Sequence, residues 1–176
     1  MNEAAKIAGV ALIAALMLAG SGRTQVPDGW GQYRNERFGF ILFYPPNLVP
    51  GPAAVDGSGM AFLAPDGLFS VFVRGFSLND REENETWKQF FDKLYVNERQ
   101  RCESSADYTA KKETWYVISG AEGGKEEYYY KVFYRGEDRN PIEFRIVYPH
   151  ALRGRFDPLL EQIAKWFIPS IPGDYE

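Results

Sequence analysis

The chain has 176 residues, of which 45% are hydrophobic and 16% aromatic, so it holds enough apolar material to fill one globular domain and too much to stay disordered. Its 20 Lys and Arg residues are scattered and oppose 24 Asp and Glu, a net charge of −4 that argues against a nucleic-acid partner. A single cysteine and a single histidine exclude an intramolecular disulfide and a cysteine-based zinc site, and we predict no cofactor and no metal.

Residues 1–21 are predicted to be a targeting leader. An unbroken run of apolar and small residues, 7–20, follows Lys6 and is shorter than the roughly 20 residues that a spanning helix needs. Ala19 and Ser21 have the spacing of a signal-peptidase site. We therefore expect an exported protein, periplasmic or secreted, with an uncleaved membrane anchor as the alternative.

The end of this leader, residues 18–21, also resembles a bacterial lipobox. In a lipobox a cysteine stands in the place of Ser21 and carries the lipid, and a serine cannot form the thioether. Membrane attachment is therefore expected only through an uncleaved N-terminal segment, or through lipid in a natural form with cysteine in place of Ser21.

The rest of the chain divides into three parts. Residues 22–32 are rich in glycine and polar residues and are predicted to be a linker. Residues 33–170 are predicted to form one folded domain, and residues 171–176 a polar tail.

The first half of the domain is predicted to contain three strands, at residues 38–44, 60–64 and 68–76. Pro45 and Pro46 end the first strand, because they supply no hydrogen-bond donors to a sheet. The turn before the third strand contains Gly67, which tolerates a positive φ, and so predicts a hairpin. Residues 50–59 are predicted to be a loop.

A helix is predicted to begin at Trp87, because apolar residues recur at intervals of three and four as far as Tyr95. Asp80 or Asn84 is expected to cap it. Extending the apolar stripe reaches Cys102, so we expect this thiol to face the core and to be structural.

The second half of the domain is predicted to be a three-stranded meander followed by a helix, with strands at residues 113–119, 126–135 and 141–148. Asp157 and Pro158 have the residue types of an N-cap and a first helical position. The apolar stripe that follows ends before Pro169. This element order predicts an α+β fold.

The same element order, opened by residues 33–40 (YRNERFGF) and by Tyr44-Pro45, resembles that of the PsbP-like family. That family includes the extrinsic subunit of photosystem II, a nuclear Ran-binding protein and many bacterial lipoproteins. The resemblance covers residues 33–168. It implies an antiparallel sheet of about six strands between helices, an α/β/α sandwich, and mostly binding or accessory roles. Leu48 departs from the pattern, near where many members have a tryptophan, and no functional residue is carried over.

No catalytic or metal-binding constellation is visible in the sequence. His150 has no accompanying nucleophile motif, and residues 57–59 lack the spacing of a nucleophile elbow. The carboxylate pairs 126–127 and 137–138 lack the ligand spacing of a calcium-binding loop, so we interpret them as solvated turn charges.

The aromatic run 128–134 is the most distinctive feature of the sequence. Alternation along a strand places a mixed aromatic and basic set on one face: Tyr129, Lys131, Phe133 and Arg135. Such a set suits a surface that binds a partner, whereas a covering helix would make the same face part of the core. Within it we expect Phe133 to be buried and Tyr129 to lie nearer the edge.

Two functional hypotheses follow. The first is an exported, non-enzymatic binding or accessory protein, with another protein as its partner. The second is an extracytoplasmic enzyme of hydrolase type with an unrecognised site near the loop 45–59. The absence of a catalytic constellation favours the first hypothesis.

Overall fold

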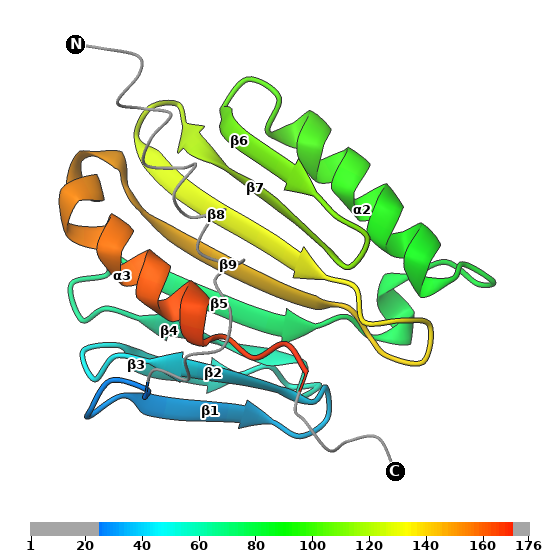
Figure 1. The fold of residues 1–176 in the computed structure, drawn as a ribbon, viewed down its shortest axis with the longest axis horizontal. Coiled ribbons are helices and arrows are strands. Elements are labelled where there is room, and N and C mark those ends of the chain that lie inside the picture. The colour runs from blue at the N-terminus through cyan, green and yellow to red at the C-terminus, as the bar shows by residue number, and fades with distance from the viewer. Residues whose placement is uncertain (1–24, 171–176) are drawn as a thin grey trace.

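The computed structural model describes residues 25–170, and these form the α+β fold that the sequence predicts (Figure 1). The nine strands of this part are β1 (Gly31–Asn35), β2 (Phe40–Tyr44), β3 (Val49–Ala53), β4 (Gly59–Leu63), β5 (Ser70–Gly75), β6 (Ala106–Lys111), β7 (Trp115–Glu122), β8 (Glu126–Phe133) and β9 (Ile142–Pro149). The two α-helices are α2 (Trp87–Arg101) and α3 (Arg153–Trp166), and two 3₁₀ helices are η2 (Leu78–Asp80) and η3 (His150–Leu152).

Seven strands form one sheet in the order β3-β4-β5-β9-β8-β7-β6, and every neighbouring pair is antiparallel. The predicted hairpin and the predicted meander are both confirmed, as β4–β5 and β7–β8–β9. Strands β1 and β2 form a separate hairpin, which is joined to the segment after α3 by a pair of 2.9 Å backbone hydrogen bonds between Ile41 and Ile168.

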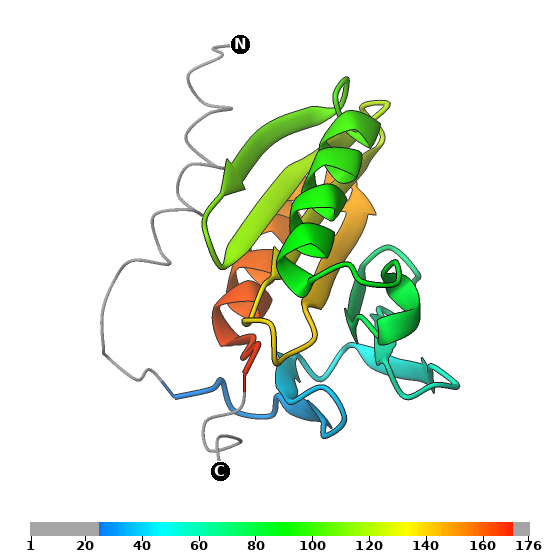
Figure 2. The ribbon, with the colours of Figure 1, turned by 90° about the vertical axis from the view of Figure 1, so that its right-hand side faces the viewer.

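The two helices lie on opposite sides of the large sheet, as Figures 1 and 2 show from two directions. One core cluster joins α3 and β2 to the middle of the sheet through buried residues such as Phe40, Phe144 and Ile163. The second joins α2 to β7 and β8 through residues such as Phe91 and Tyr116. Each face of the sheet is therefore covered by a helix over at least part of its area, as expected for a sandwich of this type.

Three strands are absent from the sequence-based prediction, and all three are short and poor in apolar alternation. Strand β3 contains Pro50 and Pro52, which a sheet tolerates here because β3 is an edge strand. Strand β6 is the opposite edge. Strand β1 begins at Gly31, within the segment predicted to be a linker.

The predicted start of α2 at Trp87 is confirmed, but its predicted cap and the predicted start of α3 need correction. Helix α2 is capped by Thr86, whose hydroxyl accepts from the Gln89 amide at 3.1 Å, and neither Asp80 nor Asn84 caps it. Helix α3 begins at Arg153, ahead of Asp157, and the Asp157 carboxylate instead accepts from the Tyr148 hydroxyl at 2.6 Å. The prediction for Cys102 is confirmed, since it ends α2 with 2% of its surface exposed.

The predicted leader and the predicted tail at 171–176 lie outside the described residues. Within residues 25–170, neither α-helix is long and apolar enough to cross a membrane.

Candidate functional site

Helix α2 covers only part of the sheet face against which it packs. On this face lie Tyr128 and Tyr130 of β8, which belong to the α2 core cluster. Directly opposite them on β9 are Val147 and Arg145. Because opposite residues of antiparallel strands share a face, the register carries this face onward across β9, β5, β4 and β3.

The part of the face beyond α2 is here called the open half. Its residues are Val49 of β3, Ala61 and Leu63 of β4, Ser70, Phe72 and Arg74 of β5, and Glu143 and Arg145 of β9, whereas Val147 packs against the α2 cluster. Val49 and Leu63 are 55% and 45% exposed. Phe72 is half-buried and belongs to neither core cluster of the described residues. A group of apolar side chains left in contact with solvent on a sheet is a typical feature of an interaction surface.

The sequence of β5 explains why this surface exists. Val71 and Val73 point into the core on the α3 side, while Phe72 and Arg74 alternate with them on the opposite face. A strand with one wetted face normally places polar residues there, but β5 places an aromatic ring there instead.

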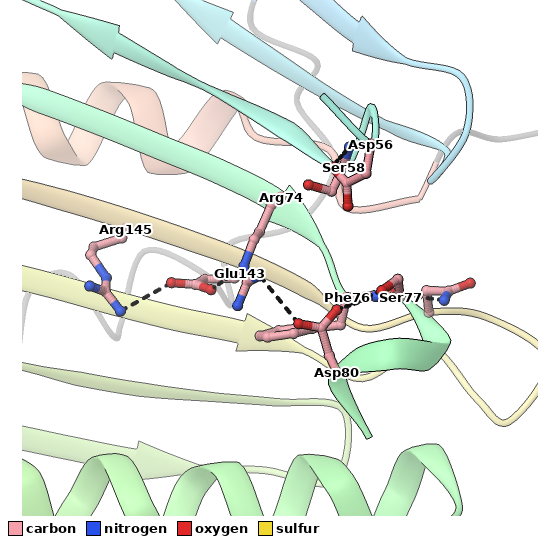
Figure 3. Close-up of polar contacts among 9 residues, drawn as sticks. Asp56, Ser58, Arg74, Phe76, Ser77, Asp80, Glu143 and Arg145 are labelled. Carbon is pink, nitrogen blue, oxygen red and sulfur yellow. Dashed lines mark hydrogen bonds and ion pairs between the residues drawn. The ribbon is translucent and has the colours of Figure 1, made fainter. Parts of the chain in front are cut away.

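Three charged side chains cross β5 and β9 along the open half, as Figure 3 shows. Glu143 is 4% exposed and lies between two guanidinium groups. Its carboxylate accepts from Nε of Arg74 at 2.9 Å and pairs with Nη2 of Arg145 at 3.1 Å. One buried carboxylate thus serves two arginines, which orients both guanidinium planes over the sheet.

Arg74 lies between two carboxylates, those of Glu143 and Asp80. Asp80 of η2 contacts Nη1 of Arg74 at 3.4 Å, and its other oxygen accepts from the Ser77 amide at 2.6 Å (Figure 3). Burial acts to lower the pKa of Arg74, but hydrogen bonding to Glu143 and the negative charges of Glu143 and Asp80 outweigh it and raise this pKa. Arg74 therefore stays charged throughout the ordinary pH range.

Arg145 carries a hydrogen-bond donor without an acceptor in the described part of the chain. The Nε atom of Arg145 is buried and has no hydrogen-bond acceptor among the described residues. Its guanidinium lies over the Tyr130 ring, 4.9 Å from the centroid, while its side chain remains 38% exposed. Arg145 stands directly opposite Phe72. Aromatic residues and arginine are both enriched at protein interfaces.

The sequence-predicted binding set lies on the other face of the sheet. Tyr129 and Lys131 are each 4% exposed, whereas Phe133 and Arg135 are half-buried. The expected order of burial between Tyr129 and Phe133 was therefore wrong: Tyr129 joins the α3 core cluster, and Phe133 packs against its margin, 5.4 Å from the ring of Phe167. Whether a partner touches this set stays a prediction.

Arg135 lies apart from the other members of this set, because it follows the end of β8. Its guanidinium donates to the backbone carbonyls of Asn140, at 2.6 and 2.9 Å, and Pro169, at 2.9 Å. These hydrogen bonds connect the loop between β8 and β9 to the segment after α3, so Arg135 stabilises the fold.

His150 has a partner that the sequence did not indicate. Its Nδ1 atom contacts the carboxylate of Glu127, which is 6% exposed and also lies 3.4 Å from Nε of Arg153. The interpretation of Glu127 as a solvated turn charge is therefore corrected, because this carboxylate is a buried link between β8 and the start of α3. Since Arg153 is the first residue of α3 and His150 precedes it in η3, the contacts of Glu127 join β8 to both helical segments.

The predicted loop 45–59 contains β3, and it contributes no lining residue to the two pockets described next. Two adjoining pockets of about 240 and 400 Å³ share Arg37, Phe38 and Asn140 in their linings. Among residues 25–170, no group of His, Cys, Asp and Glu side chains is arranged to hold a metal ion.

Comparison with known proteins gives a fold likeness. No family model matches the sequence, and no curated protein matches it. The solution structure of cyanobacterial PsbP (CyanoP) from Synechocystis sp. PCC 6803 superimposes with a TM-score of 0.50 at 11% identity, covering 86% of this chain and 98% of that one. The Ran-binding protein Mog1p of Saccharomyces cerevisiae gives 0.48 at 11% identity over 80% and 96%, and a point mutant of Mog1 gives 0.49 at 11% over 81% and 97%. The fold of this chain is PsbP-like.

Proposed function

We propose that this protein is an exported, non-enzymatic binding or accessory module that docks another protein on the open half of its sheet. The observation that carries the proposal is the position of Phe72, an aromatic side chain on a central strand that packs into neither core cluster of the described residues. A PsbP-like fold is compatible with this role, although a fold alone does not assign it. Export is proposed from the sequence of residues 1–21.

The composition of the open half favours a protein as the occupant. Its apolar residues are flanked by a fixed row of arginine and glutamate side chains, a mixture typical of the core and rim of a protein interface. The charges of Arg74 and Arg145 are balanced by Glu143 and Asp80, so this row offers directional hydrogen bonds instead of a strong field of one sign. Such a surface does not suit a polyanion such as nucleic acid.

Site-specific photo-crosslinking in the source cells tests the proposal. A photoreactive phenylalanine derivative placed at Phe72 or Leu63 should crosslink to the same protein from both positions. The control position is Val96, which is 50% exposed on α2 and lies outside the open half. Equal crosslinking from Val96, or no crosslinked protein from Phe72 and Leu63, would overturn the proposal. Phe72→Asp should abolish the crosslink from Leu63 while the protein stays folded.

A further inference from the structure

The two edge strands of the large sheet, β3 and β6, differ in their capacity to pair with a further strand (Figure 1). Strand β3 contains Pro50 and Pro52, which have no N–H group to donate to a neighbouring strand. Strand β6 contains no proline, and no strand within residues 25–170 pairs with its outer side. Because an unblocked edge is a template for strand pairing, β6 is the edge to which a further strand can add.

The backbone of β6 presents unpaired polar groups on this outer side. The Lys112 amide donates to the Trp115 carbonyl at 2.7 Å, where the chain turns from β6 into β7. Bonding direction alternates along an antiparallel strand, so Ala110 also bonds toward β7, whereas the N–H and C=O groups of Thr109 and Lys111 point away from it. Among the described residues, no backbone hydrogen bond from another element reaches these outward groups.

The side chains of β6 are self-complementary about Thr109. Asp107 and Lys111 lie two residues to either side of it, and Tyr108 and Ala110 lie one residue to either side. Two antiparallel copies of β6 centred on Thr109 therefore place Asp107 of each copy opposite Lys111 of the other, and opposite charges across a strand pair attract. Asp107 is exposed and has no opposite residue on β7, because the register between β6 and β7 shifts beside it.

Apolar side chains next to this edge would also gain cover from a second copy. Tyr108 and Trp115 are half-buried at the margin of the α3 core cluster, on one face of the sheet. In the centred pairing, the ring of Tyr108 lies opposite Ala110 of the other copy, and this contact occurs twice.

We propose that the β6 edge is the interface of a symmetric homodimer, in which the β6 strands of two copies pair antiparallel about Thr109 and join the two sheets into one. The two-fold axis is perpendicular to the sheet, so α2 and the open half of both copies lie on the same side of it. The open half lies toward the opposite edge of each sheet, from β9 to β3, and remains exposed in the dimer. The dimer thus presents two docking surfaces on one side.

Sedimentation equilibrium of the protein purified from its source cells tests the dimer. We expect twice the mass of one chain at about 100 μM, a concentration at which even a micromolar dimer is populated. Thr109→Pro should raise the dissociation constant at least about tenfold, because it removes one outward N–H donor from each copy at the centre of the interface. Thr109→Val is the matched control, since it keeps this N–H group and should leave the dimer intact.

A cysteine crosslink reports on the same pairing and does not depend on whether the proline variant folds. Opposite residues in a hydrogen-bonded pair have Cα atoms about 5.5 Å apart, within the range of a disulfide, so Thr109→Cys should link two copies on mild oxidation. Val49→Cys on the β3 edge should not. A natural protein that is monomeric at this concentration, or a dimer that Thr109→Pro leaves intact and Thr109→Cys does not crosslink, would overturn the proposal. Phe72→Asp should leave the mass unchanged, so this proposal and that for the open half fail independently.

Discussion

One face of the central sheet has two halves: one is buried under α2, and the other is in contact with solvent. Under α2, the face is filled by buried aromatic residues such as Tyr116 and Tyr130. On the open half, beyond the reach of this helix, Phe72 and Leu63 stay in contact with solvent beside a row of paired charges. The same continuous β-sheet supports both halves. The covering helix, more than the strand sequence, therefore decides whether an aromatic ring on this face contributes to the core or to a surface.

The largest expected effect comes from replacing a phenylalanine of α2 that packs against the sheet. Phe91→Ala should lower the free energy of unfolding by about 3–5 kcal/mol, because the ring is fully buried against Tyr116 and its removal leaves a cavity. Urea unfolding followed by circular dichroism measures this loss. A change below about 1 kcal/mol would mean that α2 does not pack tightly on the sheet in solution.

The sequence predicted the division only in part. The period of three and four from Trp87 to Tyr95 identified α2 and its apolar stripe, and strand alternation separated Tyr128 and Tyr130 from Tyr129 and Lys131. Neither pattern could show how far α2 extends across the sheet, because that depends on strand order, in which β9 lies between β8 and β5.

The candidate site itself was missed for the same reason. Phe72 and Arg145 are far apart in the sequence and become neighbours only because β5 pairs with β9. The aromatic run of β8 is the stronger local pattern, since its residues are consecutive. A usable signal was present in β5, where Phe72 alternates with two inward valines and so occupies the face on which a polar residue is expected.

The cationic side chains of this sheet also differ between its two faces. Arg74 and Arg145 share a buried carboxylate, whereas Lys131 has none among the described residues. Burial lowers the pKa of Lys131 to about 8, below its value near 10.4 in an unfolded chain. Between these values the unfolded state binds more protons, so stability rises with pH. The penalty of burying the charge is present in full below about pH 8 and is relieved as the pH approaches 10.4.

Lys131→Met should remove this penalty. At pH 7 the variant should be more stable than the natural protein, by about 3 kcal/mol as an upper bound for a shift of this size. The difference should narrow as the pH rises from about 8 to about 10. Urea unfolding at several pH values measures it, with Lys93→Met as the control, since the raised pKa of Lys93 places its titration above this window. An identical pH profile for the two proteins would contradict desolvation of Lys131.

A smaller effect is expected from the carboxylate of the open half. Glu143→Gln keeps the shape of the side chain but leaves the two guanidinium groups without their buried negative charge, at a cost of about 1–3 kcal/mol. The matched control is Glu36→Gln, because Glu36 pairs with Arg34 in an exposed position and should contribute about 0–1 kcal/mol. Equal effects of the two substitutions in thermal unfolding would show that the row on the open half has no special role in stability.

The smallest effect on stability should come from the residue that defines the open half. Phe72→Ala removes a ring that packs into neither core, so we expect a loss below about 1 kcal/mol, close to that of Val96→Ala on the exposed side of α2. An aromatic anchor in an interface is commonly worth about 2 kcal/mol or more, which corresponds to roughly a thirtyfold loss of affinity. Once photo-crosslinking has identified a partner, calorimetric titration should show this loss for Phe72→Ala and none for Val96→Ala. A large loss of stability with unchanged affinity would instead make Phe72 a core residue, and the open half would then be no more than an extension of the covered one.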